Sequence, residues 1–255
     1  MKNSYTVLRN IFEKSLSVNL LAENIISCKS DDDAEKIKKE MQERDFDVYG
    51  VSEEEIIIGY VLREKLSNGI IKDYTEQFKT EHLISDSTSI IELLEFLRER
   101  SYLFILEKNK VSKIVTLADL HKQPIRMMVF SLISLFEMYL TSSIKESFTN
   151  ESWKDMLSEE RLKKAKDLMA SRKEKNEALT LLDNTQLADK GTIIGKSLEH
   201  IKQLGFESKN QWKKFFGKLE QLRNNIAHAQ EEIFNDNLEV INLVLQLDQV
   251  LKRFE

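Results

Sequence analysis

Apolar and polar positions in the first half of the chain predict short strands that alternate with helices. Residues 48–51 and 56–62 are runs rich in Val, Ile, Leu and Tyr, which favours strands, and the acidic residues 52–55 between them predict a turn. Residues 34–44 follow three aspartates and carry their apolar side chains at helical spacing, which predicts a capped helix. The expected order is therefore helix, strand, turn and strand.

The same order of elements returns about 54 positions later. Residues 88–100 predict a helix, residues 102–106 and 111–115 predict strands, and residues 107–110 predict the turn between them. Leu66 and Leu120 end the two copies. Self-similarity of this kind indicates a duplicated unit, so we expect two similar lobes about a pseudo-twofold axis.

Beyond residue 123 the pattern predicts helices and no strand. Pro124, the only proline, suits the first turn of a long apolar helix over residues 125–145. Further helices are expected at residues 153–168, 172–182, 191–204, 209–229 and 238–254, with Gly205 ending one helix and Ser208 capping the next. The prediction is an α+β domain over residues 1–123, joined to an all-α bundle over residues 124–255.

Composition narrows the classes of protein that fit. A length of 255 residues suits two domains, and a net charge of −5 does not favour bulk binding of nucleic acid. Cys28 is the single cysteine, which excludes an intramolecular disulfide and a cysteine-based zinc site. The most apolar run, residues 127–140, is shorter than the ~20 residues that span a bilayer and contains Glu137. We therefore expect a buried helix, no signal peptide and a cytoplasmic protein.

The junction after the second pair of strands reads Thr116-Leu117-Ala118-Asp119. A carboxylate between a strand and a helix can accept two hydrogen bonds from a cis-diol, and a helix N-terminus favours anions nearby. The alternative is that Thr116 and Asp119 form an ordinary helix cap. Arg63 and Arg126 are candidate phosphate contacts or simply surface charges.

With its doubled unit and this junction, the region of residues 15–123 resembles a CBS-domain pair. The resemblance implies that Asp119 binds the ribose hydroxyls of an adenine nucleotide (AMP, ADP or ATP), a regulatory ligand, and that Thr116 lies near its phosphates. The first repeat has Leu62 and Lys65 at the matching positions and lacks both groups. At most one of the two clefts is therefore equipped for a ribose.

A second motif, Arg223-Asn224-Asn225-Ile226-Ala227-His228, lies within the predicted helix of residues 209–229. Residues four apart share a helix face, so Asn224 and His228 align, while Arg223 lies about 140° from His228 and reaches the same groove through its long side chain. Histidine titrates near neutrality and can move protons, and the Arg guanidinium matches phosphate oxygens. RNA supplies its own nucleophile, the 2′-hydroxyl. These residue types suit metal-independent RNA cleavage.

With the long apolar helix carrying Glu137, the segment Leu187-Ala188-Asp189-Lys190 and the closing helix, residues 124–255 resemble a HEPN domain with its Arg-x4-His ribonuclease motif. The resemblance implies catalysis by Arg223, Asn224 and His228, products ending in a 2′,3′-cyclic phosphate and a 5′-hydroxyl, and a homodimer that joins two motifs in one cleft. It also implies single-stranded RNA as substrate, a role in toxin or antiviral defence systems, and an antitoxin as a candidate partner.

Four lysines precede the motif on the same predicted helix: Lys209, Lys213, Lys214 and Lys218. They predict a local basic strip for RNA, or a solvated face between the apolar positions. The rival function for the whole chain is a non-catalytic nucleotide sensor or adaptor, in which the helical domain only dimerises and binds partners. An interhelical polar network would then explain Arg223 and His228.

Overall fold

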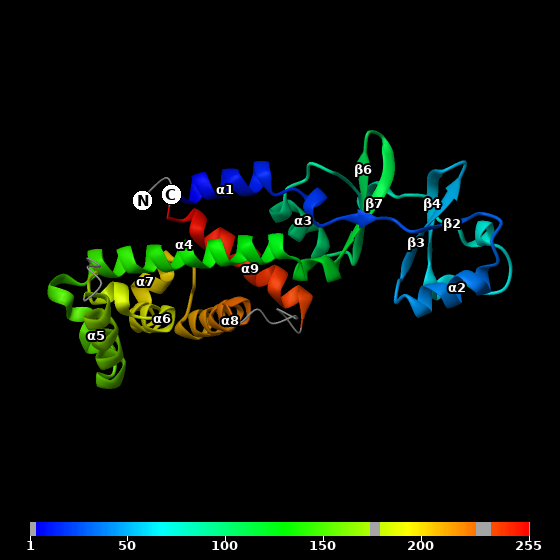
Figure 1. Ribbon diagram of the computed structural model, residues 1–255. Coiled ribbons are helices and arrows are strands. Elements are labelled where there is room, and N and C mark those ends of the chain that lie inside the picture. The colour runs from blue at the N-terminus through cyan, green and yellow to red at the C-terminus, as the bar shows by residue number, and fades with distance from the viewer. Residues whose placement is uncertain (1–3, 174–178, 228–235, 255) are drawn as a thin grey trace. The chain divides into compact units, whose positions relative to one another are not determined.

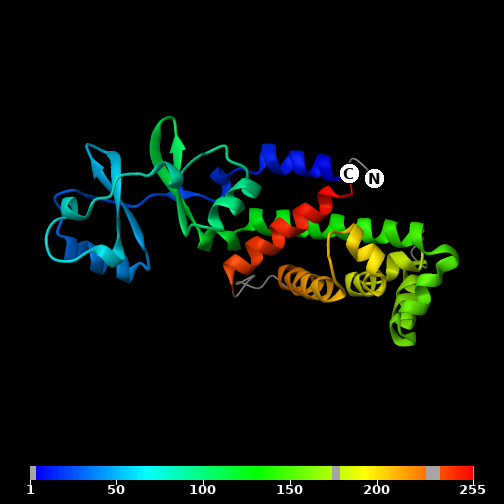
Figure 2. The same cartoon turned by 180° about the vertical axis from the view of Figure 1, so that it is seen from behind.

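The computed structural model describes residues 4–173, 179–227 and 236–254, and the chain forms two compact units. One unit comprises Ile11–Pro124 and contains the strands. The other comprises Ile125–Glu255 together with Met1–Asn10 and is helical in its described residues. Figure 1 and Figure 2 show the elements of each unit from opposite sides. The sheet-containing part thus precedes a helical part, as the sequence predicts.

The first lobe of the strand-bearing unit is a three-stranded sheet. Its order is β2 (Ser27–Lys29), β3 (Val48–Glu53) and β4 (Ile56–Leu62), with β2 parallel to β3 and β3 antiparallel to β4. Helix α2 (Ala34–Glu43) connects the parallel pair. Asp33 caps this helix by accepting a 2.8 Å hydrogen bond from the Lys36 amide, as the aspartate run predicts.

The second lobe repeats this arrangement and adds one strand. Its sheet has the order β1 (Glu23–Asn24), β7 (Lys110–Thr116), β6 (Tyr102–Glu107) and β5 (Leu83–Ser85). Helix α3 (Ile90–Leu97) again connects the parallel pair, and Ser89 begins it with a capping box to Glu92. Strand β1 comes from ahead of the first repeat and pairs with the edge of β7.

The backbone confirms the repeat position by position. The hairpin residues Glu54 and Glu55 have positive φ, and so do Lys108 and Asn109, each 54 positions later. A register shift falls between Val51 and Ser52 in the first hairpin and between Ile105 and Leu106 in the second. Irregularities that recur at the same repeat position come from the duplicated pattern and not from chance packing.

Apolar side chains from both lobes pack between the two sheets. The buried members are Ile25, Tyr60, Phe104 and Val111. The Tyr60 and Phe104 rings lie 4.9 Å apart, and Phe78 contacts both. The first lobe has a second core of its own beneath α2. The predicted pairing of two similar lobes is therefore made through an aromatic contact.

The helical unit is organised around α4 (Gln123–Ser147), most of whose apolar side chains are buried. The other helices are α5 (Glu159–Lys173), α6 (Leu187–Lys196), α7 (Leu198–Gln203), α8 (Lys209–Ala227) and α9 (Asn237–Lys252). Helices α6 and α8 approach closely where Gly191 faces the Phe216 ring, since a Cβ on Gly191 would lie 2.2 Å from that ring. The indole Nε1 of Trp212 donates to the Gly191 carbonyl at 3.0 Å.

Several predicted helix limits differ from the observed ones. The expected helix of residues 153–168 is a 3-10 segment, Thr149–Met156, followed by α5, because Leu157 is extended between them. The expected helix of residues 191–204 is two helices, because Ser197 leaves the helical conformation and caps α7. Residues 172–182 are predicted as one helix, but α5 ends at Lys173 and part of that interval lies outside the described residues. Gly205 ends α7 with φ of 90°, and Ser208 caps α8, as predicted.

The N-terminal helix α1 (Ser4–Ser15) changes the predicted division of the chain. The sequence assigns residues 1–123 to one domain, whereas Met1–Asn10 belong to the helical unit. The reason is a buried polar cluster on α9: Asp248 accepts a hydrogen bond from the Tyr5 hydroxyl and pairs with Arg9 at 3.2 Å. Both ends of the chain are thereby held in one unit.

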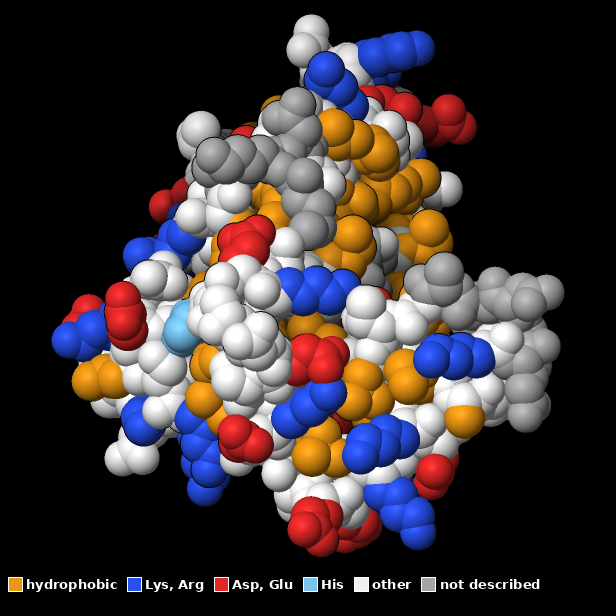
Figure 3. Space-filling model, turned by 90° about the vertical axis from the view of Figure 1, so that its left-hand side faces the viewer, with side chains coloured by type: hydrophobic (Ala, Val, Ile, Leu, Met, Phe, Trp, Pro, Cys, Tyr) orange, Lys and Arg blue, Asp and Glu red, His pale blue; other side chains and the backbone are white. Residues whose placement is uncertain are grey.

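Part of the apolar surface of the helical unit stays uncovered. Met127, Phe130 and Met138 of α4 are each at least 48% exposed. The face drawn in Figure 3 shows hydrophobic side chains gathered in its upper half. Among the described residues one helix, α4, is long and apolar enough to cross a membrane by length and composition, and half of its most apolar stretch is buried. A core helix with one open face meets the same test.

Candidate functional site

The Thr116–Asp119 junction folds as a capping box between β7 and a 3-10 turn, Leu117–His121. Asp119 Oδ2 accepts from the Thr116 amide at 2.6 Å and from its hydroxyl at 3.2 Å. Asp119 Oδ1 pairs with the Lys122 ammonium at 2.6 Å. Asp119 is only 7% exposed, so the fold already uses both oxygens of the carboxylate that the resemblance assigns to ribose.

Lys122 connects this junction to residues 21–23, near the start of the same unit, through hydrogen bonds. Its ammonium also donates to Glu23 Oε1 at 2.7 Å and to the Leu21 carbonyl at 2.6 Å. Burial lowers the pKa of Lys122, and its hydrogen bonds to Asp119 and Glu23 outweigh that effect, so the pKa is raised overall. A ribose at Asp119 would have to compete with this ammonium or share the remaining lone pairs of the carboxylate.

The first repeat carries the opposite charge at the same place. Lys65 stands 54 positions before Asp119 and pairs with Glu76 Oε1 at 2.5 Å. Arg63, a candidate phosphate contact, pairs instead with Asp47 at 2.6 Å and Asp45 at 3.5 Å. The first junction thus presents neither a carboxylate at the Asp119 position nor an unpaired guanidinium.

The second predicted site lies at the end of α8. Arg223 is exposed, and its guanidinium donates to Asn224 Oδ1 at 3.2 Å. Earlier apolar side chains of the same helix, Leu219 and Leu222 among them, are buried, whereas Ile226 within the motif is only partly buried. His228, the third predicted catalytic residue, lies outside the described residues.

The predicted basic strip on α8 is partly neutralised by the fold. The Lys209 ammonium donates to the Lys196 carbonyl at 2.7 Å, at the end of α6, and Lys218 forms an ion pair with Glu239 of α9. Lys213 and Lys214 are exposed. Only Lys213 and Lys214 of the predicted strip therefore remain exposed and without such a partner in the described part of the chain. The surface beside them is open at Gly217, where an added Cβ would have no neighbour within 4 Å among the described residues.

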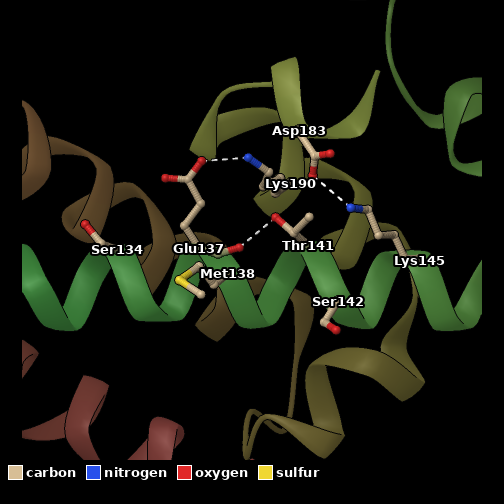
Figure 4. A pocket seen from close by; sticks show the side chains of 8 residues that line it. All are labelled: Ser134, Glu137, Met138, Thr141, Ser142, Lys145, Asp183 and Lys190. Carbon is tan, nitrogen blue, oxygen red and sulfur yellow. Dashed lines mark hydrogen bonds and ion pairs between the residues drawn. The ribbon is translucent and has the colours of Figure 1, made fainter. Parts of the chain in front are cut away.

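A groove of about 380 Å³ on the helical unit was not predicted as a site. It runs along α4 and is closed on one side by Asp183 and Lys190 (Figure 4). Lys190 is 3% exposed, and its ammonium pairs with Glu137 Oε1 at 2.6 Å and donates to the Thr185 carbonyl at 3.0 Å. Asp183 pairs with Lys145 at 2.8 Å.

Two other titratable groups among the described residues, Cys28 and His82, are each held in apolar surroundings. Burial raises the pKa of the Cys28 thiol to about 12, so this single cysteine is a poor nucleophile. Burial also lowers the pKa of His82, whose ring packs 5.1 Å from Tyr102. The described residues contain no group of three or more His, Cys, Asp or Glu side chains placed to hold a metal ion.

No protein-family model matches the sequence, and no curated protein matches it. Solved structures that resemble the chain are CBS-domain proteins, which match the sheet-containing part. The CBS domain of a bacterial CNNM/CorC-family Mg2+ transporter in complex with ATP is 14% identical, covers 49% of this chain and 96% of its own, and has a TM-score of 0.37.

CBSX2 in complex with AMP is 13% identical, covers 42% of this chain and 93% of its own, and has a TM-score of 0.36. The CBS domains of a transcriptional regulator from Streptococcus pneumoniae are 14% identical over 40% of this chain and 93% of their own, with a TM-score of 0.35. Because the identities are this low and the TM-scores lie below 0.5, these likenesses assign no function to this chain. They cover less than half of the chain.

Proposed function

We propose that this chain is a metal-independent endoribonuclease that acts as a homodimer and responds to an adenine nucleotide. The observation that carries the proposal is the exposed Arg223 on α8, whose guanidinium donates to the partly exposed Asn224 on a helix that buries its large apolar side chains up to Leu222. An exposed guanidinium held by a neighbouring amide has no structural task in the helix core. It is available to a phosphodiester.

The chemistry assigns a distinct role to each residue of the motif. His228 takes the proton of the RNA 2′-hydroxyl or returns one to the 5′-oxygen that leaves, which needs a pKa near neutrality. Arg223 stabilises the charge that develops on the phosphoryl oxygens, and Asn224 orients the guanidinium. A dimer would bring two such sets to one phosphodiester.

Regulation is assigned to the second repeat. Asp119 is the carboxylate that would accept the ribose hydroxyls, and Lys122 is the cation that a nucleotide would displace or rearrange. Because Lys122 also binds the Leu21 carbonyl and Glu23, ligand binding at Asp119 would alter how the start of this unit is held. Such coupling requires that the nucleotide bind two states of the protein with different affinity.

Cleavage of single-stranded RNA by the purified chain in the presence of EDTA tests the enzyme. We expect products with 2′,3′-cyclic phosphate ends and a loss of at least about 100-fold in rate for Arg223→Ala and for His228→Ala. The control is Arg98→Ala, which removes a half-exposed arginine from the other unit. Wild-type protein that leaves RNA intact under every nucleotide condition would favour the non-catalytic sensor instead.

Nucleotide binding is tested by thermal unfolding with AMP, ADP and ATP. A ligand at 100 times its Kd stabilises the folded state by about 2.7 kcal/mol, and we expect Asp119→Asn to weaken that ligand by at least about 10-fold. Lys65→Gln in the first repeat is the matched control and should bind as wild type does. Equal loss of affinity in both variants would remove Asp119 from its proposed role.

A further inference from the structure

Three large apolar side chains stand exposed along α4. Met127, Phe130 and Met138 are 62%, 48% and 50% exposed. They share one sector of the helix with Ser134 and Thr141, because positions three, four, seven and eleven apart fall on one face. No charged side chain occurs between Met127 and Glu137. Several large exposed apolar side chains on one face of a helix indicate an interaction surface.

The same face borders the groove of about 380 Å³ described above. Four of the groove residues, Ser134, Glu137, Met138 and Thr141, stand at positions i, i+3, i+4 and i+7 of α4. Four residues so spaced surround a single side chain of a facing helix in knobs-into-holes packing. Figure 4 shows these side chains along one side of the helix, with Lys190 and Asp183 beyond them.

We propose that a second copy of this chain packs its α4 antiparallel against this face, with Phe130 of each copy in the hole of the other. Knob and hole lie on one helix, so a twofold axis can satisfy both at once, as a dimer interface requires. The axis then passes near Ser134, midway between Phe130 and the centre of the hole. A small side chain at that point allows the helices to approach closely.

The groove can be covered by an apolar partner at little electrostatic cost. Its four charged groups are already paired within the chain, Glu137 with Lys190 and Lys145 with Asp183. The hydroxyls of Ser131 and Thr141 donate to the carbonyls of Met127 and Glu137, each at 2.8 Å. Burial therefore leaves these charges and hydroxyls with partners.

A lipid bilayer fits the face less well than a second copy. Glu137 keeps 31% of its side chain exposed and Lys145 keeps 46%, and hydrocarbon would desolvate both. Between two helices, both groups lie at the rim of the contact and stay hydrated. The partner that matches an apolar stripe flanked by paired charges is thus the same stripe on another molecule.

An engineered disulfide tests the predicted axis. Ser134→Cys should form an intermolecular disulfide on mild oxidation of the full chain, because the two residues face each other across the axis. Ser143→Cys is the matched control, a partly exposed serine nine residues on and about 180° around the same helix. Wild type, with only the buried Cys28, should stay uncrosslinked. Crosslinking at residue 143 as efficient as at residue 134 would overturn the proposal.

Measurement of molecular mass by light scattering tests the proposed role of Phe130 in the interface. Phe130→Glu should convert the dimer to a monomer or raise the dimer Kd by at least 100-fold, whereas Leu168→Glu, which changes a 42% exposed leucine of α5, should leave the dimer intact. A wild type that is monomeric at micromolar concentration overturns the proposal. So does a wild type that sediments with phosphatidylcholine–phosphatidylglycerol vesicles in a Phe130-dependent manner, since that result assigns the face to a membrane.

The proposal rests on the dimer in the proposed function, yet the two fail in different ways. A crosslinked dimer that never cuts RNA keeps the interface and removes the enzyme. A monomeric chain that cuts RNA through His228 keeps the nuclease activity and removes both the interface and the homodimer of the proposed function.

Discussion

The two junctions that end the repeated hairpins share a backbone and carry reversed ion pairs. In the first repeat an ammonium, Lys65, pairs with Glu76, and in the second a carboxylate, Asp119, pairs with Lys122. The Lys65 side chain is half exposed, whereas that of Asp119 is 9% exposed. The hairpins must keep their bulges and left-handed turns to pair the lobes. The junction side chains are not bound by this requirement, and only the second copy has a carboxylate at this position.

A second difference between the repeats predicts the largest effect on stability. Gly59 of β4 lies against the Thr75–Glu76 segment, and a Cβ there would stand 2.5 Å from the Glu76 carbonyl oxygen. Gly59→Ala should disrupt the two backbone hydrogen bonds between Tyr60 and Glu76 and cost roughly 3 kcal/mol. Lys113 occupies the same repeat position in β7, and Lys113→Ala should cost less than about 1 kcal/mol. Urea denaturation followed by a probe in the strand-bearing unit measures both, and similar costs would contradict the asymmetry.

Removing the two junction charges should have unequal consequences. Asp119→Ala leaves the Thr116 amide without its acceptor and removes one partner of the Lys122 ammonium, which keeps Glu23 and the Leu21 carbonyl, and should destabilise the unit by about 2 kcal/mol. Lys65→Ala breaks an exposed ion pair and should cost less than about 1 kcal/mol. Thermal unfolding of the two variants decides the order. A larger loss for Lys65→Ala would mean that the first junction is the more important support.

The pH dependence of the first junction gives the smallest effect. The hydrogen bond from Lys65 holds the pKa of Glu76 below its usual value. Its stabilisation is therefore fully present above the unfolded pKa of about 4.3 and is lost as pH falls through the lower folded pKa. The melting temperature of Glu76→Gln should differ most from wild type above the unfolded pKa, and the difference should shrink as pH falls below it. A difference that stays constant over this range would show that the charge of Glu76 does not matter.

Sequence patterns predict those elements whose side chains repeat over several turns or strand positions. The hairpins, α2, α3, α4 and the cap at Gly205 follow from local periodicity and turn chemistry. Strands β1, β2 and β5 are only two or three residues long, too short to show a period, and their pairing depends on partners far along the chain. The position of α1 likewise depends on a distant partner, because its Tyr5 binds Asp248 near the other end of the sequence.

The candidate sites show the same limit. The spacing of Thr116 and Asp119 predicts their use as a helix cap. The spacing of Asp119 and Lys122, three positions apart, would also have predicted their ion pair. Glu137 in an apolar helix signals a paired charge, but its partner Lys190 is 53 positions away and no local pattern names it. The exposed Phe130 looks like any core position in sequence, because helical periodicity does not say which apolar residues the rest of the chain will cover.

The hydrogen bond between Tyr5 and Asp248 joins residues 243 positions apart. During synthesis at about 5–20 residues per second, α1 therefore waits roughly 12–50 s for the helix that receives it. In sequence, the strand-bearing unit lies between Tyr5 and Asp248 and is synthesised before most of the helical unit. It can therefore fold before α9 has been made. Assembly of the helical unit, and any nuclease activity that depends on it, therefore waits until α9 has been synthesised.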